Sequence, residues 1–124
     1  MAHAHSEGFL KIVTDAKSRV RELTIPQVVE KQKRGEKFHF VDVREDSEWE
    51  KGRAQGAQHI GKGVIERDIE SLIPDHKAEI ILYCGGGFRS ALAADNLQKM
   101  GYTNVFSMDG GIRGWRDLGL PEEK

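Results

Sequence analysis

The sequence contains a single cysteine among 124 residues. A lone cysteine excludes an intramolecular disulfide scaffold, a zinc site built from several thiolates and a CxxC redox pair. No P-loop and no G-x-G-x-x-G pattern is present, so nucleotide binding has little support. Any covalent reaction at Cys84 must therefore be completed by a partner from outside the chain.

Neither sign of charge is in excess, because 19 Lys and Arg stand against 20 Asp and Glu, with a net charge of −1. Without a basic surplus we expect no nucleic-acid partner and no anionic membrane partner. The longest apolar run, 80–84, is far too short to span a bilayer. The N-terminal residues lack a basic region followed by an apolar stretch, which predicts a cytoplasmic protein, and His3 and His5 are assigned no function.

The hydrophobic pattern alternates between helix and strand periods along one domain's length of chain. Helices are predicted over 6–20, 24–35 (with Thr24 and Gln27 as a capping box), 47–52 (with a second such box beginning at Ser47), 64–72, 89–100 and 111–118. Strands are predicted over 38–43, 57–60, 79–83 and 104–108. Such alternation is typical of an α/β fold of Rossmann type, a parallel sheet with helices on both faces.

The segment most informative about chemistry is the end of the 79–83 strand, where Cys84 is followed by three glycines and then by a predicted helix. Ligands of open α/β sheets bind at the carboxyl ends of strands. A glycine loop can turn its N–H groups inward, and the helix N-terminus adds positive potential, so a thiolate is stabilised there. The alternative interpretation is an inert buried thiol beside a simple turn.

Three motifs in order resemble those of the rhodanese family, and specifically its single-domain sulfurtransferases. The first begins at Phe40-Val41-Asp42-Val43-Arg44-Glu45 and continues through Glu48-Trp49 to the glycine-spaced segment 52–60. The second is the loop from Cys84 to Arg89, with Ser90 after it. The third leads from Gly101-Tyr102 to Gly110-Gly111-Ile112-Arg113-Gly114-Trp115. The resemblance covers about 21–121, which makes 21–124 the predicted domain and 1–20 an N-terminal, largely helical extension.

The resemblance implies a rhodanese-like fold with a five-stranded, mainly parallel sheet and a reaction through a Cys84 persulfide. A thiolate would take the outer sulfur of thiosulfate or a related persulfide donor, and a thiol or cyanide-like acceptor, small molecule or protein, would remove it. The persulfide would be bound by Gly85, Gly86, Gly87, Phe88 and Arg89. No cofactor is expected, and no metal is expected because His59 and His76 form no ligand set with Cys84 that the spacing can identify.

Loop length separates the chemistries found on this scaffold. Four residues lie between Cys84 and Arg89, as in the family's sulfurtransferases, whereas related phosphatases and arsenate reductases have one more. A phosphatase or arsenate reductase, and a binding module with little turnover, remain the alternatives. The chain departs from the family pattern at Arg53 and Ala54, which replace His and Ile, and at Gly85, where thiosulfate-using members often carry a basic residue.

The remaining polar residues are predicted to support the site. Asp42 and Arg44 lie one strand period apart and are expected to brace loops, as is Ser90. Arg89 either binds the donor anion or braces the loop. Phe88 is expected to be partly exposed at the entrance. Four cations could rim the pocket, foremost Arg53 and Arg67, and also Lys62 and Arg113.

Overall fold

Five short strands form a parallel sheet at the centre of the protein, and the computed structural model describes residues 5–124. The strands of this sheet are β1 (Arg21–Leu23), β2 (His39–Asp42), β4 (Gln58–His59), β5 (Ile80–Tyr83) and β6 (Val105–Met108). Their order is β1-β6-β5-β2-β4, and every pairing is parallel. The predicted α/β class is confirmed. Residues 1–4 of the predicted extension, His3 among them, lie outside the described residues.

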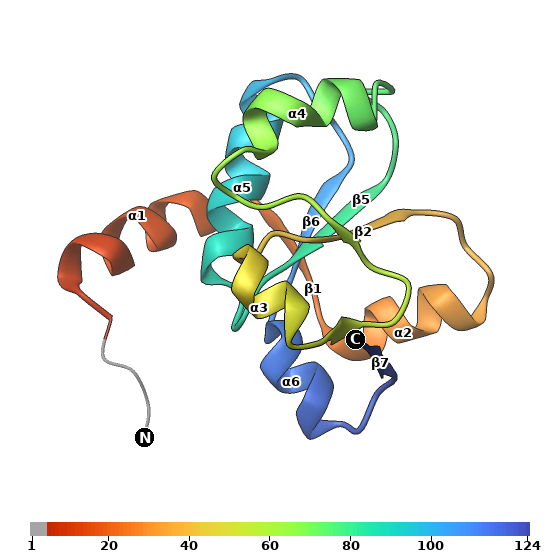
Figure 1. Cartoon of the computed structure of the whole chain (residues 1–124). Coiled ribbons are helices and arrows are strands. Elements are labelled where there is room, and N and C mark those ends of the chain that lie inside the picture. Colours follow the sequence, from red (N-terminus) through yellow and green to blue (C-terminus); the bar gives the residue numbers. More distant parts are fainter. Residues whose placement is uncertain (1–4) are drawn as a thin grey trace.

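Within residues 5–124, six helices surround the sheet (Figure 1). They are α1 (Glu7–Lys17), α2 (Ile25–Lys33), α3 (Asp46–Glu50), α4 (Ile65–Leu72), α5 (Phe88–Lys99) and α6 (Gly111–Asp117). The predicted capping box of the second helix is confirmed: the N–H of Gln27 donates to Thr24 Oγ1 at 3.2 Å, and the N–H of Thr24 donates to Gln27 Oε1 at 2.8 Å. No helix within residues 5–124 has the length and apolar character needed to cross a membrane.

Each face of the sheet carries its own hydrophobic core, because side chains alternate along a strand. From β5, Ile80 and Leu82 join the core beneath α4 and α5, and Cys84 belongs to the same cluster. Ile81 and Tyr83 join the opposite core beneath α2 and α6. The central position of β5 explains its unbroken apolar sequence, since it is buried on both faces.

The first helix packs on α5 through buried Val13 and Ala16, and Arg19 just beyond it pairs with the carboxylate of Asp95 at 2.8 Å and 3.0 Å. Figure 1 shows α1 reaching out to one side of the sheet, in red, from this contact. The helix ends at Lys17, three residues before the predicted end, because Ser18 closes its last turn.

One further prediction is wrong, and three strands were not predicted. The short helix α3 is capped by Glu45 and Glu48, not by Ser47. The strand β1 was not predicted, and neither was a small antiparallel pair of β3 (Arg53–Ala54) with β7 (Glu122–Glu123). These strands are only two or three residues long and mostly polar, so no two-residue period is visible in them.

Candidate active site

The loop that follows β5 places Cys84 at the carboxyl edge of the sheet. β5 ends at Tyr83, and α5 begins at Phe88 with Gly87 as its N-cap. Gly87 has φ +110°, a conformation that residues with a side chain rarely adopt, and a Cβ there would lie 3.3 Å from Asp109 Oδ1. The glycine is therefore required where the chain turns from strand to helix.

Backbone N–H groups of this loop point at the sulfur atom. The N–H of Gly87 donates to Cys84 Sγ at 3.2 Å, and the N–H of Ser90 donates to it at 3.4 Å. The hydroxyl of Ser90 lies 3.5 Å from the same sulfur and 2.8 Å from the hydroxyl of Ser107 on β6. Because either serine can be the donor, this pair can offer a proton to a thiolate or accept one from a thiol.

This environment favours the thiolate form of Cys84. Burial of the sulfur opposes ionisation, but hydrogen bonds from the hydroxyl and N–H of Ser90 and from the N–H groups of Gly87 and Gly86 outweigh it. The result is a pKa of Cys84 below its ordinary value. A larger fraction of this thiol is therefore ionised near neutral pH than of a free cysteine, as nucleophilic attack requires.

The start of α6 holds the other side of the loop. The N–H of Ile112 donates to the carbonyl oxygen of Cys84 at 2.9 Å, and the N–H of Arg113 donates to that of Gly85 at 3.1 Å. Because the loop's carbonyl groups are turned toward α6, its N–H groups are free to face the sulfur. Gly111 makes this approach possible, since a Cβ at this position would lie 2.7 Å from the carbonyl carbon and oxygen of Gly85.

A cavity of about 330 Å³ opens in front of the cysteine. Its lining residues are His5, Phe9, Cys84, Gly86, Phe88, Arg89 and Arg113. Only 1% of Cys84 is exposed, so a reactant reaches Sγ from this cavity. Phe88 is half-buried, as was predicted for the entrance.

Arg89 both lines the cavity and ties the loop to α3. Its guanidinium donates to the two carboxylate oxygens of Glu48 at 2.7 Å and 3.1 Å, a bidentate pair. These hydrogen bonds lower the pKa of Glu48 to about 2, although burial opposes the shift. The same bonds raise the pKa of Arg89, and the charge of the Cys84 thiolate adds to that effect. The sequence left open whether Arg89 binds the donor anion or braces the loop. In the structure Arg89 makes a bracing contact with Glu48 and also lines the cavity.

Asp42 and Arg44 form a buried pair away from the cavity. Arg44 Nη2 donates to Asp42 Oδ2 at 2.8 Å, and the exposed fractions of the side chains are 4% and 0%. Arg44 also donates to the carbonyl oxygen of Gly52 at 2.7 Å, and its own carbonyl lies 2.8 Å from His59 Nε2. The pair thus joins β2 to the segment between α3 and β4, which is a bracing role.

Replacing Asp42 with alanine is expected to lower the free energy of unfolding by about 3–5 kcal/mol, because the buried Arg44 charge would lose its partner. Urea denaturation measures the change. The matched control is Asp68→Ala, whose partner Arg67 is 74% exposed, and it should leave the free energy of unfolding almost unchanged. Equal losses in the two variants would contradict the bracing role.

The structure corrects the placement of the predicted rim cations. Arg53 lies over the ring of Trp49 at 4.3 Å and donates to the Trp49 carbonyl oxygen. Arg67 pairs with its neighbour Asp68 at 2.7 Å. Neither these two nor Lys62 lines the cavity, whereas Arg113 does. The difference arises because α6, and not the segment after α3, packs against the active-site loop.

Sequence reasoning missed three residues of the site: His5 and Phe9, which line the cavity, and Ser107, which contacts Ser90. Phe9 falls within the helix predicted over 6–20, but nothing in that pattern marks it as a cavity residue. Ser107 is buried, and the other residues of its strand are apolar. A single hydroxyl in an otherwise apolar strand is the one sequence signal that could have identified it. His5 carries no such signal.

The model of the family described as Rhodanese-like domain matches residues 25–118. The chain belongs to this family. Thiosulfate sulfurtransferase PspE of Escherichia coli (strain K12) is a rhodanese relative 31% identical over 86 residues, which are 69% of this chain and 79% of PspE. Thiosulfate sulfurtransferase GlpE of Actinobacillus succinogenes is 36% identical over 84 residues, 68% of this chain and 74% of GlpE. A match to YrkF of Bacillus subtilis (strain 168), at 32% identity over 79% of this chain, spans only 52% of YrkF.

Among solved structures, RPA3614 of Rhodopseudomonas palustris CGA009 superposes with a TM-score of 0.87 at 30% identity. The superposition covers 99% of each chain, so it includes α1, which lies outside the residues matched to the rhodanese family. That protein is described as one of unknown function and a possible tyrosine phosphatase. A rhodanese from E. coli solved with anions superposes with a TM-score of 0.62 at 30% identity, over 71% of this chain and 99% of the other.

Proposed function

We propose that this rhodanese-like domain is a sulfurtransferase that moves a sulfane sulfur from an anionic donor, such as thiosulfate, to an external thiophilic acceptor. The observation that carries the proposal is the pair of N–H groups, from Gly87 and Ser90, that donate to Cys84 Sγ at the floor of an open cavity. The sulfurtransferase names of PspE and GlpE support the same class of reaction.

In the first step the Cys84 thiolate attacks the outer sulfur of thiosulfate. A new S–S bond forms between the two sulfurs, and the donor's own S–S bond breaks with its electron pair leaving on sulfite. The enzyme is left with a negatively charged persulfide, so the total charge is unchanged. In the second step an acceptor thiolate or cyanide attacks the terminal sulfur, and the Cys84 thiolate is the leaving group.

The residues of the site divide these tasks. The loop N–H groups that stabilise the thiolate are also placed to bind the persulfide's charge. The guanidinium groups of Arg89 and Arg113 supply positive charge to an anionic donor entering the cavity. Because the described chain has no other cysteine, the persulfide cannot be resolved within it.

Intact-mass spectrometry under non-reducing conditions tests the proposal. Incubation with thiosulfate, or with an organic thiosulfonate, should add one sulfur atom to the protein, and cyanide should remove it as thiocyanate. No adduct with either donor would overturn the proposal. If the protein formed no adduct but hydrolysed an aryl phosphate, a phosphatase function, as suggested for RPA3614, would be favoured. If it neither formed an adduct nor hydrolysed the phosphate, a binding module would be favoured.

A further inference from the structure

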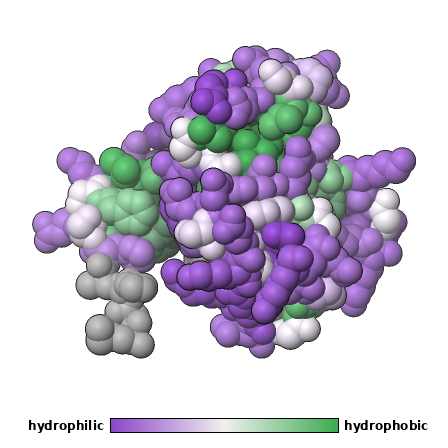
Figure 2. Space-filling model, in the orientation of Figure 1, coloured by the Kyte–Doolittle hydropathy of each residue, from purple (hydrophilic) through white to green (hydrophobic). Residues whose placement is uncertain are grey.

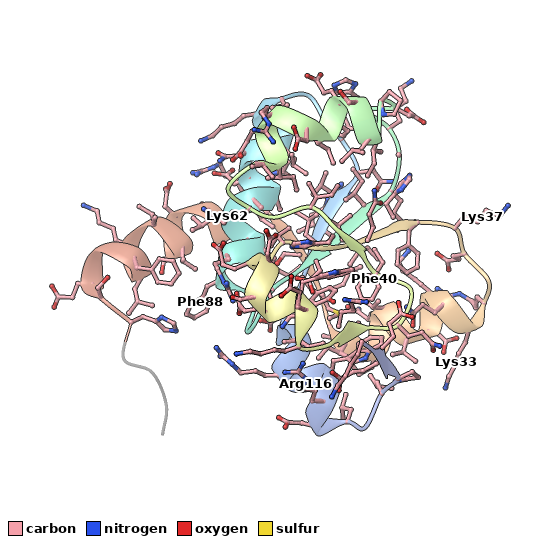
Figure 3. All side chains as sticks on the ribbon, in the orientation of Figure 1. Lys33, Lys37, Phe40, Lys62, Phe88 and Arg116 are labelled. Atoms are coloured by element: carbon pink, nitrogen blue, oxygen red, sulfur yellow. The ribbon has the colours of Figure 1, made fainter. Side chains whose placement is uncertain are left out.

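Three aromatic rings form one wall of the cavity in front of Cys84. The ring of Phe88, at the start of α5, lies 5.0 Å from that of His5 and 6.1 Å from that of Phe9, and these two lie 5.3 Å apart. Figure 3 shows Phe88 reaching from its helix to α1. All three residues line the cavity, and two of them come from a segment that the rhodanese match does not include.

Several contacts fix α1 in this position. Ser6 caps the helix by accepting the N–H of Phe9 at 3.3 Å. Lys17, at the other end of α1, places its ammonium 5.1 Å from the centre of the Phe88 ring. Together with buried Val13 and Ala16, these contacts make α1 a fixed wall and not a loose tail. Figure 2 shows hydrophobic residues gathered over this helix, whereas the surface over α3 and α6 is hydrophilic.

The cavity is also lined by two cations, Arg89 and Arg113. The Arg113 guanidinium lies against the glycine loop: a Cβ on Gly86 would lie 3.0 Å from Arg113 Nη1, and one on Gly85 would lie 3.3 Å from Nη2. Arg89 stands beside it, paired with Glu48. The lining of the cavity therefore combines two cationic groups beside the active-site loop with three aromatic rings.

The volume of the cavity exceeds what a small inorganic anion fills. About 330 Å³ falls at the lower end of the range of pockets that hold organic ligands, roughly 300–1,000 Å³. Thiosulfate at the arginines would leave the aromatic wall in contact with water. A donor with an apolar body would cover that wall and bury its surface. An aromatic donor would gain more, because contacts between aromatic rings contribute free energy beyond that of the buried area.

We propose that the preferred donor is an organic sulfane-sulfur anion with an aromatic body, in the class of aryl thiosulfonates, and that Phe9 and Phe88 select it. This inference rests on the proposed function and names its substrate class. The Cys84 thiolate attacks the terminal sulfur of the thiosulfonate, and the donor's S–S bond breaks with its electrons leaving on an aryl sulfinate. Charge balances without a proton, since a thiolate and a thiosulfonate become a persulfide and a sulfinate. The sulfonyl oxygens face Arg113 and Arg89, and the ring packs on the aromatic wall.

The test compares benzenethiosulfonate, methanethiosulfonate and thiosulfate as donors, with cyanide as acceptor and thiocyanate as the measured product. For the unmodified protein, kcat/KM with the benzene compound should exceed that with the methane compound at least about tenfold. Phe9→Ala should lower the ratio of benzenethiosulfonate to thiosulfate kcat/KM by about tenfold. Ile12→Ala, on the same helix but 53% exposed and outside the cavity, should leave that ratio unchanged.

Phe9→Leu provides a second variant that retains apolar bulk for packing and removes only the ring, and it should lower the same ratio about threefold. No aryl preference in the unmodified protein, or an unchanged ratio in both Phe9 variants, would overturn the inference and leave the proposed function standing. Absence of thiocyanate with all three donors would instead defeat the proposed function itself.

Discussion

Replacing Cys84 with serine is expected to abolish sulfur transfer, with a fall in kcat/KM of at least about 10⁴-fold. A serine hydroxyl can accept the same N–H groups of Gly87 and Ser90, but it stays protonated at neutral pH and forms no persulfide. The folded structure should persist, with a change in the free energy of unfolding within about 1.5 kcal/mol, because volume and hydrogen bonds are nearly conserved.

Thiocyanate formation and intact mass, measured on the same preparation, test this expectation. Urea denaturation is the control that shows the variant to be folded. Residual transfer above about one part in a hundred, by a folded Cys84→Ser protein, would mean that another group carries the sulfur.

Gly111→Ala should damage both stability and transfer, because this glycine lets α6 reach the active-site loop. It has φ +55°, and a Cβ would lie 2.7 Å from the carbonyl group of Gly85 and closer still to the Cys84 carbonyl oxygen. Strain and displacement together should lower the free energy of unfolding by about 3 kcal/mol or more. Displacing the loop also moves the N–H groups away from Sγ, and a shift of about 1 Å is enough to cost roughly 10²-fold in rate.

Gly119→Ala is the matched control for this variant. Gly119 also has a left-handed conformation, with φ +67°, but a Cβ there would meet no atom within 4 Å. It should cost about 1 kcal/mol of backbone strain and leave sulfur transfer as it is. Wild-type transfer by Gly111→Ala would show that α6 does not hold the loop in its reactive form.

Local sequence signals predicted the parts of the fold that depend on local physics. The apolar run at 79–83 predicted a strand, and Thr24 with Gln27 predicted a capped helix, because each signal lies within a few residues. Cys84 and the glycines after it were found for the same reason, since strand, loop and helix are contiguous.

What the sequence did not reveal depends on contacts between distant segments. Nothing in the pattern of 6–20 shows that Phe9 meets Phe88, because that contact follows from how α1 crosses α5. Arg113 lines the cavity and Arg53 does not, because α6 approaches the active-site loop closely at Gly111. This contact joins two segments that lie far apart in the sequence. Residue type and spacing alone leave such pairings undetermined.

The most direct test of the account is the pH dependence of Cys84 alkylation. Iodoacetamide reacts with the thiolate, so its rate, followed by intact mass, reports the pKa of this one sulfur. The hydrogen bonds from Ser90, Gly87 and Gly86 predict a midpoint below that of a free cysteine derivative titrated in the same buffer, whose pKa is about 8.5. A midpoint at or above the free cysteine's would contradict the claim that this loop keeps Cys84 ionised for attack.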